Sequence, residues 1–186
     1  DVLPTSEMGL VKRNHLRWNY WESNYATISN NSLWNRSVVS DRRRLIFKCD
    51  YFCGGLGDRF RGIVTCFVLA LVTDRQFMID ITHPLNMKNF LLPNMYNWTF
   101  SRRKGRIMGS TKIFRAIDRE PTFESLIQSQ PFAKIFAQYH DIEIYTNIDL
   151  VADIFRNPNV QDNEIIKLFK KDIPLAKLNM HVLFPF

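Results

Sequence analysis

At 186 residues, the chain has the length of one domain and can bury a substantial hydrophobic core. Hydrophobic residues make up 46% of it and include fifteen phenylalanines, which argues against disorder over most of the chain. The net charge of +7 suits an anionic partner, but no nucleic-acid-binding signature accompanies the basic clusters, so nucleic acid is not an expected partner.

Residues 1–43 are polar with aromatic patches, and we expect them to form a stem-like or surface extension. Strands and helices then alternate over residues 44–186, which predicts an α/β domain. The longest apolar run, at residues 63–72, is far shorter than the roughly 20 residues of a membrane-spanning helix. A membrane is therefore expected as a partner only through an anchor that this sequence does not contain.

The most informative stretch lies between an apolar strand at residues 45–47 and the apolar run at residues 63–72, which predicts a buried helix. Its sequence is Cys53-Gly54-Gly55-Leu56-Gly57-Asp58-Arg59-Phe60-Arg61-Gly62. The helix is expected to begin at Arg59, and a second strand follows at residues 77–81. Strand, glycine-rich turn, helix and strand together form the βαβ unit of nucleotide-binding sheets.

A turn of this composition can bind an anion. Glycines let backbone N–H groups approach a ligand closely, and the helix N-terminus offers partial positive charge. With the arginine side chains as further donors, the predicted binding residues are Gly55, Leu56, Gly57, Arg59 and Arg61. If the turn needs positive φ angles at its glycines, a side chain at Gly55 or Gly57 should damage binding. The alternative is a plain turn whose glycines only tighten the packing of helix against strand.

Two known phosphate-binding patterns fit this turn poorly. The P-loop pattern aligns at Gly57 and Gly62, but Ile63 and Val64 replace the lysine and hydroxyl residue that bind phosphate and magnesium. The dinucleotide fingerprint requires a third glycine where Phe60 stands. Because Asp80 ends the second strand, where a ribose-binding acid belongs, a dinucleotide site remains an alternative.

A loop around a short helix is predicted at residues 82–100 and a basic irregular segment at residues 101–121. A helix at residues 123–136 and a strand at residues 141–145 should follow, and then two further helices at residues 148–155 and 163–171. Thr122 is the expected N-cap of the helix at residues 123–136. Asn157-Pro158 should end the helix before it, because proline disfavours helical conformation in the residue that precedes it.

The turn resembles the N-terminal motif of a fucosyltransferase group that includes plant xyloglucan enzymes, rhizobial Nod-factor enzymes and many invertebrate proteins. The matching residues are Gly54-Gly55-Leu56-Gly57-Asp58-Arg59, the apolar helix and the strand that ends in Asp80. Weaker matches follow in the same order at Pro84-Leu85, Phe90-Leu91-Leu92-Pro93-Asn94, Trp98, Tyr145-Thr146-Asn147 and Leu183-Phe184-Pro185. The resemblance covers residues 44–186.

The resemblance implies a Rossmann-like three-layer domain, similar to the N-terminal, acceptor-side half of a GT-B glycosyltransferase. The C-terminal donor-binding domain of such enzymes is expected to be absent from this sequence. For the complete enzyme, the resemblance implies metal-independent transfer of fucose from GDP-fucose to a glycan acceptor in the Golgi lumen. A non-catalytic or truncated glycan-binding module of the same family is the alternative, and a dinucleotide-binding oxidoreductase is the third hypothesis.

Fucosyl transfer needs a group that accepts the proton of the acceptor hydroxyl, usually a carboxylate. Asp58 is the candidate catalytic residue, because it stands where the resembled enzymes carry Asn or Asp. Its alternative role is to cap the helix. The four histidines lack metal-ligand spacing, and His83 is a loop residue just beyond the second strand. No metal site is therefore predicted.

Three cysteines and three N-glycosylation sequons remain. Cys66 is expected to be buried in the helix, but the disulfide pairing of Cys49, Cys53 and Cys66 is left open: one pair could form a bridge, or one cysteine could pair with the absent domain. The sequons begin at Asn30, Asn35 and Asn97 and favour the secretory lumen. Asn97 is the least convincing of the three, because it coincides with the Asn-Trp stretch of the resemblance.

Overall fold

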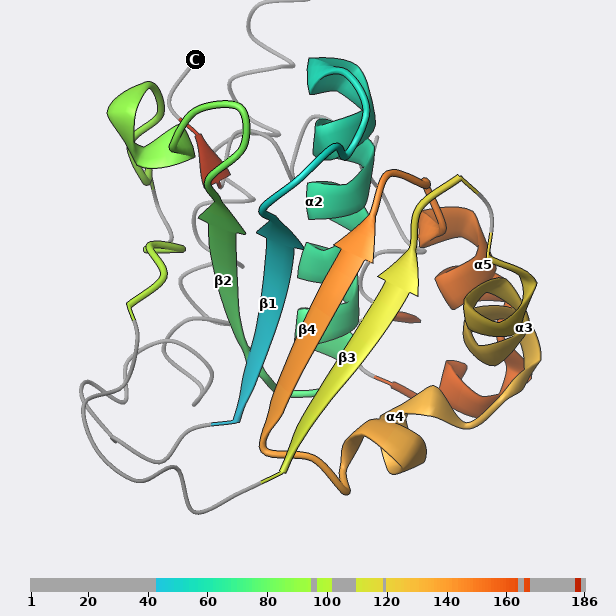
Figure 1. Ribbon diagram of the computed structural model, residues 1–186. Coiled ribbons are helices and arrows are strands. Elements are labelled where there is room, and N and C mark those ends of the chain that lie inside the picture. Colours follow the sequence, from blue (N-terminus) through green and yellow to red (C-terminus); the bar gives the residue numbers. More distant parts are fainter. Residues whose placement is uncertain are drawn as a thin grey trace, which may run out of the picture. The chain divides into compact units, whose positions relative to one another are not determined.

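The computed structural model describes residues 43–94, 97–101, 110–118, 120–163, 166–167 and 183–184 (Figure 1). The chain separates into two compact units, Asp1–Asp41 and Arg42–Phe186, and the described residues all belong to the second. Several predictions concern residues outside the described ranges: the extension at residues 1–43, of which only Arg43 is described, the sequons at Asn30 and Asn35, and the basic cluster at residues 102–106. Most of the helix predicted at residues 163–171 also lies outside them.

The second unit is built on a parallel sheet of four strands in the order β2-β1-β4-β3. The strands are β1 (Arg44–Cys49), β2 (Gln76–Ile81), β3 (Thr111–Ala116) and β4 (Asp141–Thr146). The helices are α2 (Leu56–Val72), α3 (Pro121–Ser129), α4 (Phe132–Phe136) and α5 (Val151–Arg156), with short 3₁₀ turns η2 (Met87–Asn89) and η3 (Pro158–Val160). The predicted α/β class and the parallel sheet are confirmed.

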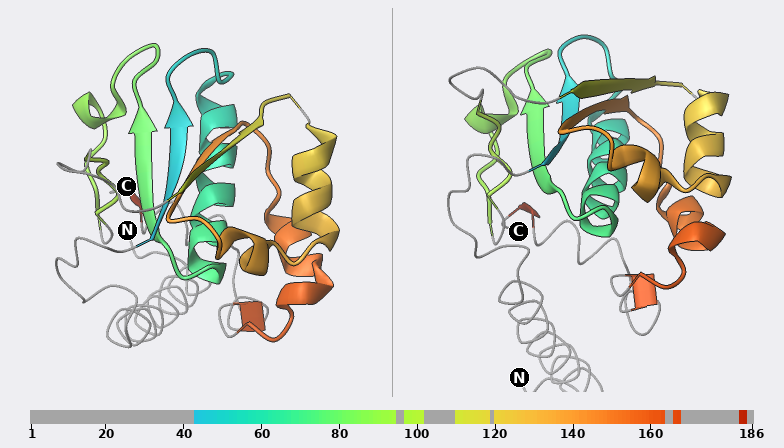
Figure 2. Two further views of the ribbon diagram at one scale, coloured as in Figure 1. Left: turned by 60° about the horizontal axis from the view of Figure 1, so that its bottom comes forward. Right: turned by 90° about the horizontal axis from the view of Figure 1, so that it is seen from below.

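Helices α2, α3 and α5 lie on one face of the sheet (Figure 2). The crossover from β1 to β2 and the crossover from β3 to β4 both move in the same direction along the strand order. Because parallel crossovers are right-handed, both must place their helices on the same face. Of the three layers expected, the described residues thus show the sheet and one helical layer.

Helix α2 packs against the middle of the sheet and is buried along most of its length, as its apolar sequence predicts. Its one interior glycine makes this packing possible. A Cβ added to Gly62 would lie 2.1 Å from the carbonyl oxygen of Thr146 in β4 and 2.6 Å from the ring of Phe47 in β1. In dinucleotide-binding folds the third glycine of the fingerprint allows helix and strand to pack closely. Gly62 performs this role here, although it lies two residues after Phe60, which occupies the fingerprint position.

A buried arginine stabilises the end of the sheet at which the strands begin. Arg75 is 5% exposed and donates hydrogen bonds to the carbonyl oxygens of Arg44 (3.3 Å), His140 (3.0 Å), Tyr139 (2.7 Å) and Phe136. Its burial lowers its pKa to about 10, so it remains a cation at neutral pH. Arg75 thereby ties the start of β1 to the turn that leads into β4.

The structure corrects several predicted boundaries. The segment predicted as irregular at 101–121 contains β3, whose mostly exposed residues gave no apolar run to detect. The helix predicted at 123–136 is two helices, separated where Pro131 removes a backbone donor, and Glu120 rather than Thr122 caps the first. Helix α2 begins three residues before Arg59, and α5 begins at Val151 rather than at residue 148.

Candidate functional site

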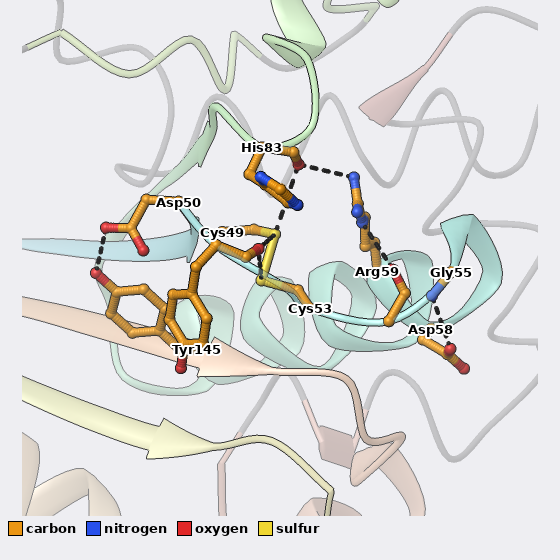
Figure 3. Close-up of a disulfide and its surroundings, with 10 residues drawn as sticks. Cys49, Asp50, Cys53, Gly55, Asp58, Arg59, His83 and Tyr145 are labelled. Carbon is orange, nitrogen blue, oxygen red and sulfur yellow. Dashed lines mark hydrogen bonds between the residues drawn. A yellow bond between two sulfur atoms is a disulfide. The ribbon is translucent and has the colours of Figure 1, made fainter.

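The candidate site lies at the turn between β1 and α2 (Figure 3). A disulfide joins Cys49, the last residue of β1, to Cys53, which settles the pairing that the sequence left open. The carbonyl oxygen of Cys49 accepts hydrogen bonds from the N–H groups of Thr82 (2.9 Å) and His83 (3.2 Å), which follow β2. The disulfide thus lies where the carboxyl ends of two neighbouring strands meet. Cys66 is buried in α2 as expected, and its burial raises the pKa of the thiol.

Gly54 is the glycine of the turn that needs a special backbone conformation. Its φ of +76° lies in the left-handed region, and an added Cβ would lie 2.7 Å from Oδ2 of Asp58. Gly55 is extended, with φ of −70°, and a Cβ on Gly57 would meet nothing within 4 Å. The expectation of a positive φ at Gly55 or Gly57 is therefore wrong, and sequence reasoning missed Gly54 because three glycines within four residues left the strained one ambiguous.

Asp58 caps helix α2 from within its first turn. Its Oδ2 accepts a hydrogen bond from the N–H group of Gly55 at 3.0 Å, which is the return half of a capping box. Its Oδ1 lies 3.3 Å from Nη1 of Arg61, on the helix surface. Arg61 is largely exposed and its contact is with this carboxylate. The capping role that the sequence offered as the alternative for Asp58 is thus what the structure displays.

The first N–H groups of α2 are open to a ligand. The helical hydrogen bonds begin with the N–H group of Arg59, which donates to the carbonyl oxygen of Gly55 at 3.1 Å. Within the described part of the chain, the N–H groups of Leu56, Gly57 and Asp58 have no hydrogen-bond acceptor. Because α2 has 17 residues, these donors also carry the positive end of a substantial helix dipole. Two of the predicted binding positions, Leu56 and Gly57, therefore supply free backbone donors here together with Asp58, whereas the N–H groups of Gly55 and Arg59 are bonded within the turn.

Arg59 links the two turns that leave β1 and β2. Its Nε donates to the carbonyl oxygen of Gly54 at 3.3 Å and its Nη1 to that of His83 at 2.9 Å (Figure 3). Among the described residues, no acceptor bonds to its Nη2, which therefore remains available to an anion at the N-terminus of α2. The sequence identified Arg59 as a binding residue but gave no sign that it also positions the turn, since its partners are backbone carbonyls.

Asp80 lies at the carboxyl end of β2, as expected, and is paired there with a lysine. Phe47 faces α2, so its neighbour Lys48 faces the opposite side of the sheet, and Asp80 pairs with Lys48 there at 3.7 Å. Glu143 lies 3.4 Å from the same lysine. Burial lowers the pKa of Lys48, but the neighbouring groups Glu143, Tyr145 and Asp80, of which Glu143 has the largest effect, outweigh burial and raise the pKa overall. The acid that the dinucleotide hypothesis requires is therefore already paired with Lys48 of the neighbouring strand.

A polar group that the sequence did not indicate lies beside the disulfide loop. The hydroxyl of Tyr145, at the end of β4, donates to Asp50 at 3.0 Å, and the guanidinium of Arg115 lies 4.4 Å from the centre of the Tyr145 ring. Burial, followed by the hydrogen bond to Asp50, raises the pKa of Tyr145, so its hydroxyl keeps its proton at neutral pH. Strand β3 was missed in the sequence, which is why Arg115 was missed with it.

No group of three or more His, Cys, Asp or Glu side chains that could hold a metal ion occurs in the described ranges. None of the helices in those ranges is long and apolar enough to cross a membrane.

Comparison with known proteins rests on solved structures, because no protein-family profile and no curated protein matches this chain. A variant of the fucosyltransferase FUT1 of Arabidopsis thaliana, solved in complex with GDP, matches with a TM-score of 0.61 and 14% sequence identity. The match covers 77% of this chain and 37% of FUT1, so the chain spans little more than a third of that protein's length. The likeness shows that this chain has the Rossmann-like α/β fold found in a fucosyltransferase.

Proposed function

We propose that the complete enzyme to which this domain belongs transfers fucose from GDP-fucose to a hydroxyl group of a glycan. The single observation that carries this proposal is the likeness of the fold, over 77% of this chain, to a fucosyltransferase that was solved with GDP. The sequence resemblance at Gly54 to Arg59 supports the same reaction, because it lies in the residues of the turn and not in the fold.

In this proposal, the N-terminus of α2 receives negative charge of the donor or of the departing diphosphate. The free N–H groups of Leu56, Gly57 and Asp58 converge there, and Nη2 of Arg59 adds a charged donor. Such preorganised donors stabilise the charge that develops as the nucleotide leaves. Arg61 adds less, because it is exposed and pairs with Asp58.

A catalytic role for Asp58 stays a prediction. Both carboxylate oxygens contact donors, namely the Gly55 N–H group and Arg61. To accept a proton from an acceptor hydroxyl, Asp58 would have to exchange the Arg61 contact for the substrate. The Asp58–Arg61 pair is exposed and therefore weak, so this exchange costs little.

The first experiment measures GDP release from GDP-fucose in the presence of mixed glycan acceptors, with the longest natural form of the protein. UDP-galactose and GDP-mannose serve as matched donors that change the base or the sugar. We expect turnover with GDP-fucose. Turnover with another sugar nucleotide but none with GDP-fucose would disprove the donor assignment, and saturable glycan binding without any transfer would favour the non-catalytic module.

The second experiment asks whether this chain itself contacts the nucleotide. Amide NMR of the 186-residue chain is followed during titration with GDP, and we expect the signals of Leu56, Gly57 and Asp58 to shift together. NAD is the control that tests the oxidoreductase hypothesis, because a saturable shift with NAD and none with GDP would favour it. Shifts confined to residues far from the turn would contradict the placement of the anion.

We also propose that the protein acts in the Golgi lumen, held by an anchor outside this sequence. The Cys49–Cys53 disulfide supports an oxidising compartment, because such bonds are rare in the cytosol of most organisms. Subcellular fractionation of the tagged natural protein tests this, and recovery in the cytosol would contradict it.

A further inference from the structure

The segment from Asn97 to Thr99 lies along the outer edge of the sheet. Thr99 forms a parallel bridge with Ile79, and the N–H group of Ile79 donates to the carbonyl oxygen of Trp98 at 2.9 Å. Because β2 is an edge strand of the four-stranded sheet, these three residues cover an edge that would otherwise expose unpaired backbone groups.

The middle residue of the segment fixes which way its neighbours point. Trp98 is fully buried, its indole N–H donates to the carbonyl oxygen of Leu183 at 2.7 Å, and its ring meets that of Phe184 edge-on. Consecutive side chains of an extended segment point in opposite directions. Asn97 accordingly is exposed, while the chain beside it is held firmly by the tryptophan.

The side chain of Asn97 is exposed and forms its hydrogen bonds through its oxygen. Its Oδ1 accepts hydrogen bonds from the N–H group of Thr99 at 3.1 Å and from the Thr99 hydroxyl at 2.6 Å. Both contacts use the oxygen, and within the described residues Nδ2 has no acceptor. The asparagine and the hydroxyl residue of the sequon therefore already lie together, with the nucleophilic nitrogen free.

We propose that Asn97 is an N-glycosylation site. In the reaction, Nδ2 of Asn97 attacks the anomeric carbon of an oligosaccharide carried on a lipid diphosphate. A carbon–nitrogen bond forms as the carbon–oxygen bond to the diphosphate breaks, the amide nitrogen gives up one proton, and the lipid diphosphate leaves. The sequence alone made this the least convincing of the three sequons, whereas the structure exposes Asn97 and brings its side chain together with the Thr99 hydroxyl.

The position suits a permanent modification. A glycan on Asn97 would extend from the sheet edge beside β2, whereas the proposed anion site lies beyond the carboxyl ends of the strands. It would shield an edge from pairing with another chain without entering the core. The inference concerns a separate surface and does not depend on the proposed transferase activity.

The test is mass spectrometry of the whole chain, secreted from insect cells behind a signal peptide. Treatment with an amidase that removes N-glycans should lower the mass and convert Asn97 into aspartate in the corresponding peptide. Asn97→Gln and Thr99→Ala should each remove one glycan. Thr99→Ser should keep it, because the hydroxyl is retained, and Asn89→Gln should keep it, because that exposed asparagine lies outside any sequon.

The modification state of Asn97 in the unaltered chain tests the proposal without any variant. Secreted, folded chain whose Asn97 stays unmodified while Asn30 or Asn35 carries a glycan would overturn the inference. A variant that fails to fold is recognised by the loss of its cooperative thermal transition, and the comparison between Thr99→Ala and Thr99→Ser then decides the question, since the two differ in the hydroxyl that the sequon requires.

Discussion

The guanidinium of Arg59 donates to the carbonyl oxygen of His83 at 2.9 Å, which joins the first turn of α2 to the segment that follows β2. The same side chain also bonds to the carbonyl oxygen of Gly54. The Arg59 side chain thereby connects the loop that follows β1 to the loop that follows β2, the neighbouring strand. Arg59 positions the turn even before any ligand is present, and its removal should affect both stability and binding.

Replacing Arg59 by alanine should lower the free energy of unfolding by about 1–3 kcal/mol, because two carbonyl groups lose a charged donor. It should also weaken GDP binding. The matched control is Arg61→Ala, which removes an equally charged side chain from an exposed pair and should change stability little. Urea unfolding and GDP titration check both variants, and equal effects of the two changes would contradict the assigned role.

Substitution of the turn glycines by alanine should change the free energy of unfolding differently at Gly54 and at Gly57. Gly54→Ala should destabilise the protein by about 1–2 kcal/mol, because a Cβ is disfavoured at a φ of +76° and would collide with Asp58. Gly57→Ala should be neutral or stabilising by up to about 1 kcal/mol, since the added methyl meets nothing and alanine favours a helix. Thermal unfolding of both variants is the measurement, and a reversed order would contradict the observed turn.

Gly62→Ala should be more damaging than either change in the turn. The added Cβ would lie 2.1 Å from a backbone carbonyl of β4, which cannot rotate away. Helix α2 would have to move off the sheet, at a cost of about 1–3 kcal/mol or more. Gly57→Ala in the same helix is the control, and urea unfolding compares them. A Gly62→Ala protein as stable as the parent would show that the helix packs less closely than the structure has it.

The α/β class and the first βαβ unit could be predicted because their signals are local. Apolar runs mark β1, α2 and β2, and alternation marks β4. Strand β3 could not be found in this way, because it lies at the sheet edge and most of its residues are exposed, among them Lys112 and Arg115. An edge strand has only one neighbour to pair with and little apolar surface to bury, so its sequence resembles that of a loop.

The glycine-rich turn could be predicted from the sequence but its internal contacts could not, and ligand binding at the turn stays a prediction. The glycine run predicted the turn between β1 and α2, although the helix begins at Leu56 and not at Arg59. The partners of Arg59, however, are backbone carbonyls of Gly54 and His83, and any residue type supplies those. Likewise, the Cys49–Cys53 bond depends on how the loop after β1 turns, which three cysteines in a sequence do not specify.

Reduction of the Cys49–Cys53 disulfide should lower the free energy of unfolding by about 2 kcal/mol, the amount expected for a loop of this small size. Alkylation under native conditions provides the matched control. After reduction, Cys49 and Cys53 should react, whereas Cys66 should stay protected, because it is buried and its thiol pKa is raised. Native alkylation of Cys66 before reduction would contradict the burial of α2 against the sheet.

The carboxylate of Glu120 should make the stability of the protein depend on pH in the acid range. Glu120 caps α3 by accepting hydrogen bonds from the N–H groups of Thr122 and Phe123. The side-chain hydrogen bond with Thr122, followed by the bond from the N–H group of Phe123, lowers the pKa of Glu120 below its usual value of 4.5. A carboxylate with a lowered pKa in the folded state contributes stability above pH 4.5, and this contribution disappears as the pH falls through the lowered value.

Glu120→Gln should therefore reduce stability at neutral pH and narrow the difference in stability between neutral and acid solution. Glu124→Gln is the control, because it removes another carboxylate from the first turn of the same helix without removing the cap. Urea unfolding of the parent and both variants at pH 7 and near pH 3 measures the effect. If the Glu120→Gln protein loses as much stability on acidification as the parent does, the cap at Glu120 does not contribute to the acid sensitivity.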